Sequence, residues 1–209
     1  MITNMAIVED NLITNVIVID DENTSMIEQL NAQPIPEGKW IGDYYHTVQD
    51  TIKEKEVEIS EACNQTIING VDVETSHGTD HFNLANEDQA NISNLFRVVE
   101  LGGTEYPYQA DNGECYAYSA EDIAKIYLAT QSHITQQITY HNLLKKYLNT
   151  LVADEEVEKV VYGMPLPEEY QTEMTEKLAV AQAQISTIVE KMGLSQEETS
   201  EESEPEANT

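Results

Sequence analysis

The sequence predicts an α+β fold, in which small β-hairpins and separate helices build the core. Short β-branched runs meet at the turn signals Asp10-Asn11, His77-Gly78 and Asp111-Asn112-Gly113. Elsewhere, apolar residues recur at the spacing of amphipathic helices. We therefore expect a β-rich attachment module at 1–46, a domain of two hairpins and three helices at 47–152, a helical extension at 153–193 and a disordered acidic tail at 194–209.

The N-terminal module begins with MAIVEDNLITNVIVI, residues 5–19, which reads as two β-branched runs around Asp10-Asn11 and predicts a small hairpin. Ser25 and Glu28 have the spacing of a capping box, so a short helix should start there. The segment WIGDYY, residues 40–45, fits either a further strand or an aromatic-packed loop. We expect this module to attach the protein to a partner.

The first long helix is expected from about Thr47 to Asn69, and the dipeptide Asn69-Gly70 is a good helix stop. Charged residues solvate one face of this segment. The opposite face carries the residues expected in the core: Ile52, Ile59, Ala62, Cys63, Thr66 and Ile67.

The segment VDVETSHGTDHFNL follows this helix and predicts a hairpin whose two-residue loop is His77-Gly78, with glycine supplying a positive φ. This register pairs Val73 with Phe82 on an apolar face. It pairs Glu74 with His81 on the polar face, as a half-buried hairpin requires.

Asn86 should cap a second helix, with Gln89 at the capping-box position. The segment TEYPYQADNGECYAY then predicts the second hairpin. Ser119 should cap a third helix that keeps one apolar face to about Leu151. Such a helix would span roughly 50 Å, more than a small domain needs. We expect it to project or to pack against another chain.

The C-terminal helix, from about Pro167, carries an apolar seam with alternating four- and three-residue spacing, the pattern of a short coiled coil. The seam is a candidate oligomer or partner surface, and a helix packed against its own domain is an equal alternative. From Ser195 onward the acidic tail lacks an apolar pattern and should be disordered. The seam comprises Met174, Leu178, Ala181, Ile185, Ile188 and Met192.

The 209-residue chain has 10 basic and 39 acidic residues, a formal net charge of −29. This charge argues against nonspecific binding to nucleic acid or to anionic lipid, which both require clustered basic residues. No run approaches the roughly 20 apolar residues of a membrane span. The N-terminus lacks the basic start of a signal peptide, so we expect a cytoplasmic product. Cys63 and Cys115 should be core thiols, with a single disulfide left open.

The motif HGTDH invites a metal site at His77, Asp80 and His81. The expected hairpin argues against it, because His77 falls in the turn and Asp80 points to the face opposite His81. His133 and His141 lie two helical turns apart, too far for one ion without another element. No phosphate-binding loop or hydrolase motif is present. We therefore assign no catalytic residue, no cofactor and no metal.

The block from about Lys53 to Leu151 contains KEKEVEISEACNQTIINGVDV, HFNLANEDQANI, YPY, an acidic turn and YSAEDI. In this order, the segments resemble a small domain of unknown function that recurs in tailed-phage and prophage proteins. The opening AIVEDNLITNVIVID, followed by WIGDYY, is similar to the starts of small tail-fibre-associated proteins.

The resemblance implies a non-enzymatic component of the tail fibre or baseplate, or a fibre-assembly factor. Its partners would be tail-fibre or baseplate proteins, and homo-oligomerisation is left open. The protein would act in the host cytoplasm during assembly, with a place in the virion tail as the open alternative. The family offers no established catalytic residues to carry over.

Two other function classes remain. The first is an acidic nucleic-acid mimic that inhibits a host DNA-binding protein, which would need carboxylates at regular spacing on a rigid face. The charges here are instead mixed with lysine and concentrated in the tail. The second is a hydrolase, which would need several carboxylates to converge in a deep pocket.

Overall fold

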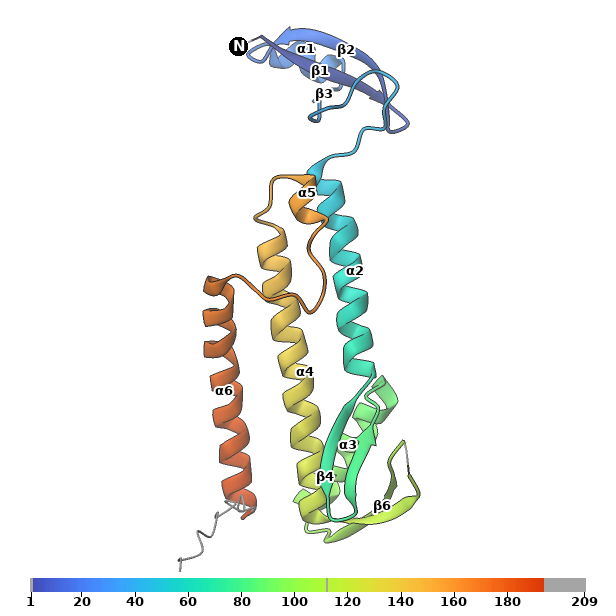
Figure 1. Ribbon diagram of the computed structural model, residues 1–209, viewed down its shortest axis with the longest axis vertical. Coiled ribbons are helices and arrows are strands. Elements are labelled where there is room, and N and C mark those ends of the chain that lie inside the picture. Colours follow the sequence, from blue (N-terminus) through green and yellow to red (C-terminus); the bar gives the residue numbers. More distant parts are fainter. Residues whose placement is uncertain (1, 112, 194–209) are drawn as a thin grey trace, which may run out of the picture. The chain divides into compact units, whose positions relative to one another are not determined.

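The computed structural model describes residues 2–111 and 113–193, and its fold is α+β (Figure 1). The acidic tail from residue 194 lies outside the described residues, as do Asn112 and the side chain of Met192. The strands are β1 (Ile2–Glu9), β2 (Leu12–Asp20), β3 (Ala32–Pro34), β4 (Val71–Thr75), β5 (Gly78–Phe82), β6 (Glu105–Gln109) and β7 (Cys115–Ser119). The helices are α1 (Thr24–Gln29), α2 (Val48–Ile68), α3 (Asn86–Glu100), α4 (Ala120–Leu148), α5 (Asp154–Val157) and α6 (Glu168–Met192).

The chain divides into two compact units, each built from segments that are distant in sequence. The first unit comprises the residues up to Ser60 together with Lys145–Pro165. The second comprises Glu61–Leu144 and the residues from Leu166 onward. The long helices α2 and α4 therefore contribute residues to both units.

The N-terminal hairpin is confirmed as an antiparallel pair of β1 and β2. Asp10 and Asn11 form its turn with φ of 51° and 61°, a conformation that Asn and Asp tolerate. Strand β3 adds to the other side of β1, so the sheet order is β2-β1-β3. One face of the sheet carries an apolar cluster that includes α1: Met5, Ile7, Ile17, Ile19, Ile27 and Ala32.

The start of α1 differs from the expected capping box. Asn23, not Ser25, occupies the N-cap, and its side-chain oxygen accepts a hydrogen bond from the Met26 N–H. Asn is at least as good a cap as Ser, and its carboxamide reaches the first free N–H groups of the helix. The cap consequently lies two residues before Ser25, and the helix starts at Thr24.

Residues 40–45 form a loop rather than a strand, and the loop lies against the start of β2. The Ile13 N–H donates to the Asp43 carbonyl, and the Gly42 N–H donates to the Ile13 carbonyl, both at 2.9 Å. The Tyr45 N–H donates to the Asn11 carbonyl at 2.8 Å. The loop therefore covers the outer edge of β2 over its first residues.

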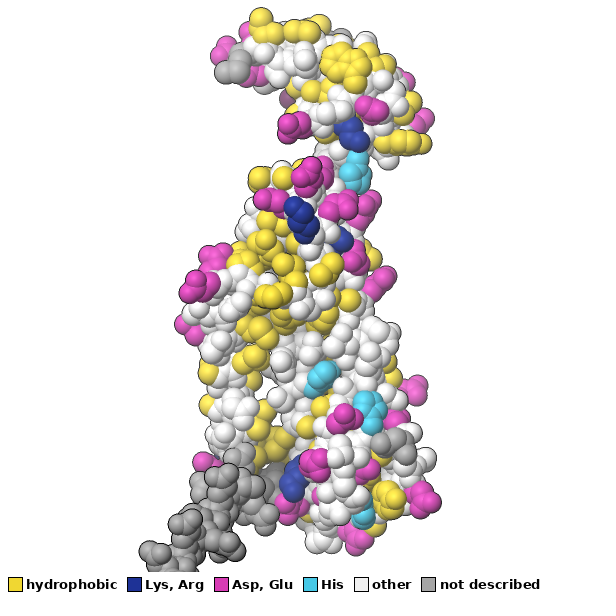
Figure 2. All heavy atoms as spheres, in the orientation of Figure 1, with side chains coloured by type: hydrophobic (Ala, Val, Ile, Leu, Met, Phe, Trp, Pro, Cys, Tyr) yellow, Lys and Arg dark blue, Asp and Glu magenta, His cyan; other side chains and the backbone are white. Residues whose placement is uncertain are grey.

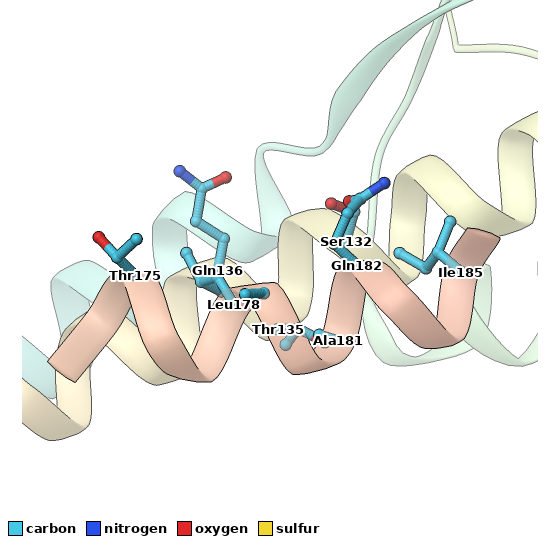
Figure 3. Close-up of a pocket in the computed structure, with 9 residues that line it drawn as sticks. Ser132, Thr135, Gln136, Thr175, Leu178, Ala181, Gln182 and Ile185 are labelled. Carbon is cyan, nitrogen blue, oxygen red and sulfur yellow. The ribbon is translucent and has the colours of Figure 1, made fainter. Parts of the chain in front are cut away.

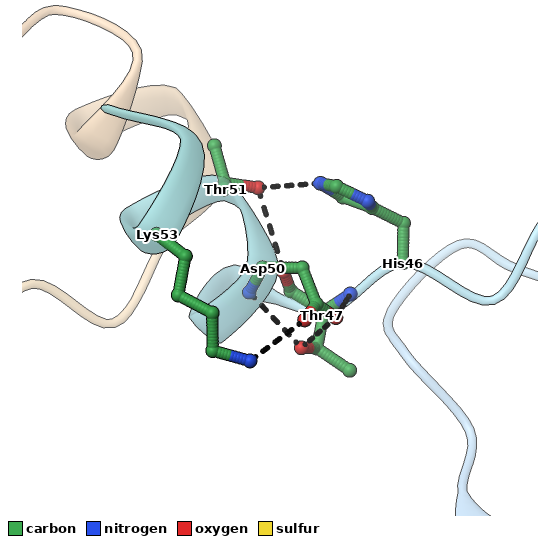
Figure 4. A network of polar contacts seen from close by, with 5 residues as sticks. All are labelled: His46, Thr47, Asp50, Thr51 and Lys53. Carbon is green, nitrogen blue, oxygen red and sulfur yellow. Dashed lines mark hydrogen bonds and ion pairs between the residues drawn. The ribbon is translucent and has the colours of Figure 1, made fainter. Parts of the chain in front are cut away.

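Helix α2 starts where Thr47 and Asp50 form a reciprocal cap (Figure 4). The Thr47 hydroxyl donates to Asp50 Oδ2 at 2.6 Å, and the Thr47 N–H donates to the same oxygen at 3.1 Å. The Asp50 N–H donates back to Thr47 Oγ1 at 3.3 Å. The side-chain and backbone hydrogen bonds of Thr47, followed by the ion pair with Lys53, lower the pKa of Asp50 to about 2.

The buried Thr51 hydroxyl links this helix start to α5. It donates to Asp154 Oδ1 at 2.6 Å and lies 3.0 Å from His46 Nε2. A hydroxyl has one proton to donate. Because that proton is directed at Asp154, His46 must carry a proton on Nε2 and donate it to Thr51.

The hairpin of β4 and β5 forms, but its turn is Ser76-His77 rather than His77-Gly78. Val73 lies opposite Asp80, so the expected pairing of Val73 with Phe82 is wrong by two positions along β5. The two faces are still as expected, because a shift of two positions leaves each side chain on its original face. The turn moves because Ser76 is bound by a carboxylate from α4, described below.

Helix α3 starts one residue earlier than expected, with Ala85 at the N-cap. The Ala85 N–H donates to Asp88 Oδ2 at 3.2 Å, so Asp88 takes the capping-box position assigned to Gln89. The Gln89 side chain instead donates to the Leu84 carbonyl at 2.7 Å. Asn86 is therefore the first helical residue and not the cap.

Aromatic contacts join the hairpins and helices of the second unit. The Phe82 ring stacks on Tyr108 with centroids 6.3 Å apart and meets Tyr118 edge-on at 6.1 Å. The Phe96 ring of α3 stacks on Tyr127 of α4 at 4.1 Å. Other fully or nearly fully buried side chains of this unit are Leu84, Ile92, Ile123, Ile126 and Leu144.

Substitution of Gly70 by alanine should destabilise the protein by at least about 3 kcal/mol. Gly70 has φ of +83°, and an added Cβ would overlap the Phe82 carbonyl oxygen. Gly78→Ala is the matched control, since Gly78 has φ of +113° but no neighbour within 4 Å of the added Cβ. The control should lose only about 1–2 kcal/mol from backbone strain. Urea unfolding of the full chain measures both, and equal losses would contradict the overlap.

Candidate functional site

Asp122, near the start of α4, accepts four hydrogen bonds within the second unit. Its side chain is buried, with 2% of the residue exposed. It accepts hydrogen bonds from the Ser76 N–H at 2.8 Å, the Ser76 hydroxyl at 2.7 Å, the Ser119 hydroxyl at 2.8 Å and the Ser119 N–H at 3.3 Å. The carboxylate therefore holds the turn between β4 and β5 against the start of α4.

Ser119 also caps α4, as expected, because Ser119 Oγ accepts from the Asp122 N–H at 3.1 Å. Burial acts to raise the pKa of Asp122, but the hydrogen bonds from Ser76 and Ser119 outweigh it, so the pKa lies below its ordinary value. Asp122 stays ionised at neutral pH. Its charge faces the N-terminus of α4, where the helix dipole favours an anion.

A second buried carboxylate, Asp80, lies on the inner face of the same hairpin. It accepts from the Tyr118 hydroxyl at 2.9 Å and from the Thr75 hydroxyl at 2.8 Å. Burial, followed by the neighbouring Asp80, raises the pKa of Tyr118 above its ordinary value. The phenol therefore remains a donor to Asp80 throughout the ordinary pH range.

His77 lies in the turn and contacts the second hairpin. Its ring stacks on Tyr116 with centroids 4.5 Å apart and meets Tyr118 edge-on at 5.3 Å. Its Nε2 lies 3.3 Å from the Ala117 carbonyl oxygen. Ring stacking and this backbone contact account for the position of the His77 ring.

His81 faces Asp72 across the strands, so the expected partner Glu74 is wrong. His81 Nδ1 lies 2.6 Å from Asp72 Oδ1, and Nε2 lies 2.9 Å from the Asn69 carbonyl oxygen. The hydrogen bond to Asp72 is the main cause that raises the pKa of His81, and the Asn69 carbonyl adds to it. Glu74 instead lies opposite Thr79.

The other histidines and the two cysteines do not come together in one site. Among residues 2–111 and 113–193, no cluster of three or more His, Cys, Asp or Glu side chains could hold a metal ion. His133 Nε2 lies 3.2 Å from the Thr66 carbonyl, and His141 is half-buried. Both cysteines are free thiols; Cys63 is buried as expected, whereas Cys115 is exposed, so its expected core position is wrong.

The apolar seam of α6 lies along α4 within the second unit. Its five described members are all half-buried. Three of them, Leu178, Ala181 and Ile185, line a groove of about 380 Å³ (Figure 3). The α4 side of this groove is polar: Ser132, Thr135 and Gln136. The seam thus packs against its own unit, and its role as an oligomer or partner surface stays a prediction.

The N-terminal segment exposes several large apolar side chains, visible in Figure 2 on the part that contains β1–β3. We name Trp40, Ile41 and Tyr44 the aromatic loop; 56%, 49% and 71% of these residues are exposed. On the adjacent sheet, Ile2 and Val18 are 73% and 70% exposed. The three exposed side chains of the aromatic loop lie within five positions of the sequence, and such a group is typical of a contact surface.

Residues 50–162 match a family described as Domain of unknown function (DUF4376), and this match covers more than half of the chain. The chain belongs to the DUF4376 family. The DUF4376 region contains Asp72, Asp80 and Asp122 with their partners, whereas β1–β3, the aromatic loop and α6 lie outside it. Neither a curated protein nor a solved structure matches the chain. In the described part of the chain, no helix combines the length and apolar character required to cross a membrane.

Substitution of Asp72 by asparagine should lower the pKa of His81 towards about 6.5. A raised folded-state pKa stabilises the protein fully below the unfolded value, and this stability is lost as pH rises through the folded value. The variant should therefore lose stability at about pH 5 and little at about pH 8. NMR titration of His81 measures the shift. Glu74→Gln is the control, and an equal fall in that variant would contradict the Asp72 pairing.

Replacement of Asp122 by asparagine should destabilise the protein by about 1.5–3 kcal/mol at neutral pH, because the amide cannot accept every bond that the carboxylate accepts. The lowered pKa means that this stability is present above about pH 3.9 and is lost as pH falls through the folded value. The variant's unfolding free energy should vary less with pH in acid. Glu121→Gln, an exposed neighbour paired with Lys125, should change stability by less than about 0.5 kcal/mol.

Proposed function

We propose that the chain is a non-enzymatic bacteriophage or prophage protein of the tail-fibre or baseplate region, where it acts through protein–protein contacts. It serves either as a structural component or as a fibre-assembly factor. The observation that carries this proposal is the aromatic loop, which presents Trp40, Ile41 and Tyr44 to solvent outside the DUF4376 region. Trp and Tyr are enriched among the residues that dominate binding energy at protein interfaces.

The environment of the buried carboxylates supports a non-catalytic role. A catalytic acid or base must reach a substrate proton. The two carboxylate oxygens of Asp122 instead accept four hydrogen bonds from Ser76 and Ser119. Asp80 is bound by Tyr118 and Thr75. Both carboxylates therefore serve to join hairpins and a helix.

The placement in a tail rests on the resemblance of residues 53–151 to the phage-associated domain and of the N-terminus to tail-fibre-associated proteins. Tail-fibre or baseplate proteins are the proposed partners, met in the host cytoplasm during assembly. The net charge of −29 fits this role, because like charge limits self-aggregation and a basic patch on a partner would be steered towards the chain.

Mass spectrometry of purified particles tests the proposal. A structural component should be present in the particles in stoichiometric copies. An assembly factor should be absent from them, and deletion of its gene should yield particles without fibres. Normal, fibre-bearing particles after deletion would contradict both roles. Capture of host nuclease subunits in that case would favour the acidic nucleic-acid mimic.

The substitution Trp40→Ala should reduce fibre attachment at least about tenfold if the aromatic loop is the contact, since a buried Trp at an interface contributes about 2 kcal/mol or more. Val57→Ala is the control, because Val57 is 58% exposed against 56% for Trp40 and lies on α2 inside the DUF4376 region. Electron microscopy counts fibre-bearing particles for both variants. Equal loss would place the contact elsewhere.

A further inference from the structure

Strand β2 is an edge strand with one half left open. The sheet order β2-β1-β3 gives the sheet two outer edges. The β3 edge is blunted, because that strand has three residues and ends at Pro34, which lacks an N–H group. The loop at residues 42–45 covers the start of β2 through its bonds to Asn11 and Ile13. Beyond Ile13, within the described residues, β2 pairs with β1 alone.

The alternation of hydrogen bonds fixes which backbone groups point outward along this open half. The Val16 N–H donates to the Asn15 side chain at 2.9 Å. The Asp20 carbonyl likewise accepts from the Asn23 N–H, at 2.9 Å. Backbone groups of alternate residues in an antiparallel strand point to the same side. The N–H and carbonyl of Val18 therefore point away from the sheet, as Val16 and Asp20 do.

Strand β2 has a bulge at Thr14, where its register with β1 shifts, but the four residues Val16–Ile19 beyond it carry none of the usual protection. Exposed edges normally hold a lysine, a proline or a bulge that prevents another strand from pairing. The open half reads Val16-Ile17-Val18-Ile19, four β-branched apolar residues in succession, and 70% of Val18 is exposed. Such a segment pairs readily with an added strand and is prone to aggregation when left unpaired.

Charge selects the occupant of the edge. Among residues 1–45, Lys39 is the single basic side chain. The acidic side chains in the same segment are Glu9, Asp10, Asp20, Asp21, Glu22, Glu28, Glu37 and Asp43. A second copy would bring two acidic edges together, and like charges across paired strands are destabilising. A strand that carries lysine or arginine would be attracted instead.

We propose that Val16–Asp20 of β2 is a strand-addition site that takes an extended, basic segment of a partner protein as a fourth strand of the N-terminal sheet. Main-chain hydrogen bonds to the Val16 carbonyl and to the N–H and carbonyl of Val18 supply affinity, and the acidic run Asp20-Asp21-Glu22 at the end of the strand selects a basic sequence. The partner's place in a phage tail rests on the proposed function. The site itself rests on the sheet edge and its charge.

A synthetic peptide in which lysine and valine alternate tests the site on the full-length protein. Binding should slow hydrogen exchange at the Val18 amide, which the added strand would cover, and NMR of isotopically labelled protein reads this amide directly. The same peptide with alternate backbone nitrogens methylated keeps its charge but cannot pair. It should bind at least about tenfold more weakly.

Two substitutions at one position separate backbone pairing from side-chain contact. Val18→Pro removes the outward N–H without touching the bonds to β1, and edge strands tolerate proline. It should weaken peptide binding at least about tenfold. Val18→Thr keeps the N–H and the side-chain shape, so it should change binding by less than about twofold. Thermal unfolding checks that each variant is folded. If Val18→Pro does not fold, the methylated peptide still tests backbone pairing on the unsubstituted protein.

Three outcomes would overturn the inference. Equal binding of the methylated and unmethylated peptides would show attraction by charge alone. An unprotected Val18 amide in the complex would place the peptide elsewhere. Self-association that Val18→Pro abolishes, seen by analytical ultracentrifugation, would make a second copy the occupant. If the peptide fails while Trp40→Ala still loses fibres, the proposed function stands and the strand-addition site falls.

Discussion

The buried carboxylate of Asp122 is the interaction on which the hairpin unit depends. An ionised carboxylate is costly to bury unless its oxygens are hydrogen-bonded. Here Ser76 and Ser119 donate to it from segments far apart in sequence, and its charge also faces the start of α4. Without the carboxylate, the turn at Ser76 loses its partner on the helix. The position of this turn decides which residues pair across β4 and β5. It is therefore the reason that His81 faces Asp72.

The sequence predicted the periodic features of this fold and failed where a distant partner decides. Both faces of the β4–β5 hairpin were predicted, because side-chain alternation follows from local pattern. The turn was not, since Ser76-His77 and His77-Gly78 are equally plausible loops until Asp122 binds Ser76. Asp122 itself was missed among 39 acidic residues. Its position three residues after the Ser119 cap was the available signal, and that signal indicates a capping box but not a second partner.

The apolar seam of α6 shows the same limit. Heptad spacing indicates that one helical face will be covered, but it does not identify the surface that covers it. The groove between α6 and α4 sets Leu178 and Ile185 against Ser132 and Gln136. Such a contact, apolar on one side and polar on the other, buries less apolar area than a seam packed on a like seam, so its contribution to stability is smaller. An apolar partner would bury more apolar area of α6 than the polar face of α4 does. The seam is therefore suited to packing against its own unit and also to binding a partner.

The DUF4376 region and the N-terminal segment differ in where their notable side chains lie: buried and hydrogen-bonded in the first, exposed to solvent in the second. In the DUF4376 region, Asp80 and Asp122 are used to join elements, so substitutions there act first on stability. In the N-terminal sheet, the small cluster around Met5 and Ile19 maintains the fold, while the aromatic loop and the edge at Val18 face solvent. Side chains that face solvent can change without loss of the core that supports them. Under the proposed function, partner choice can therefore vary in the N-terminal segment while the fold of the family region is retained.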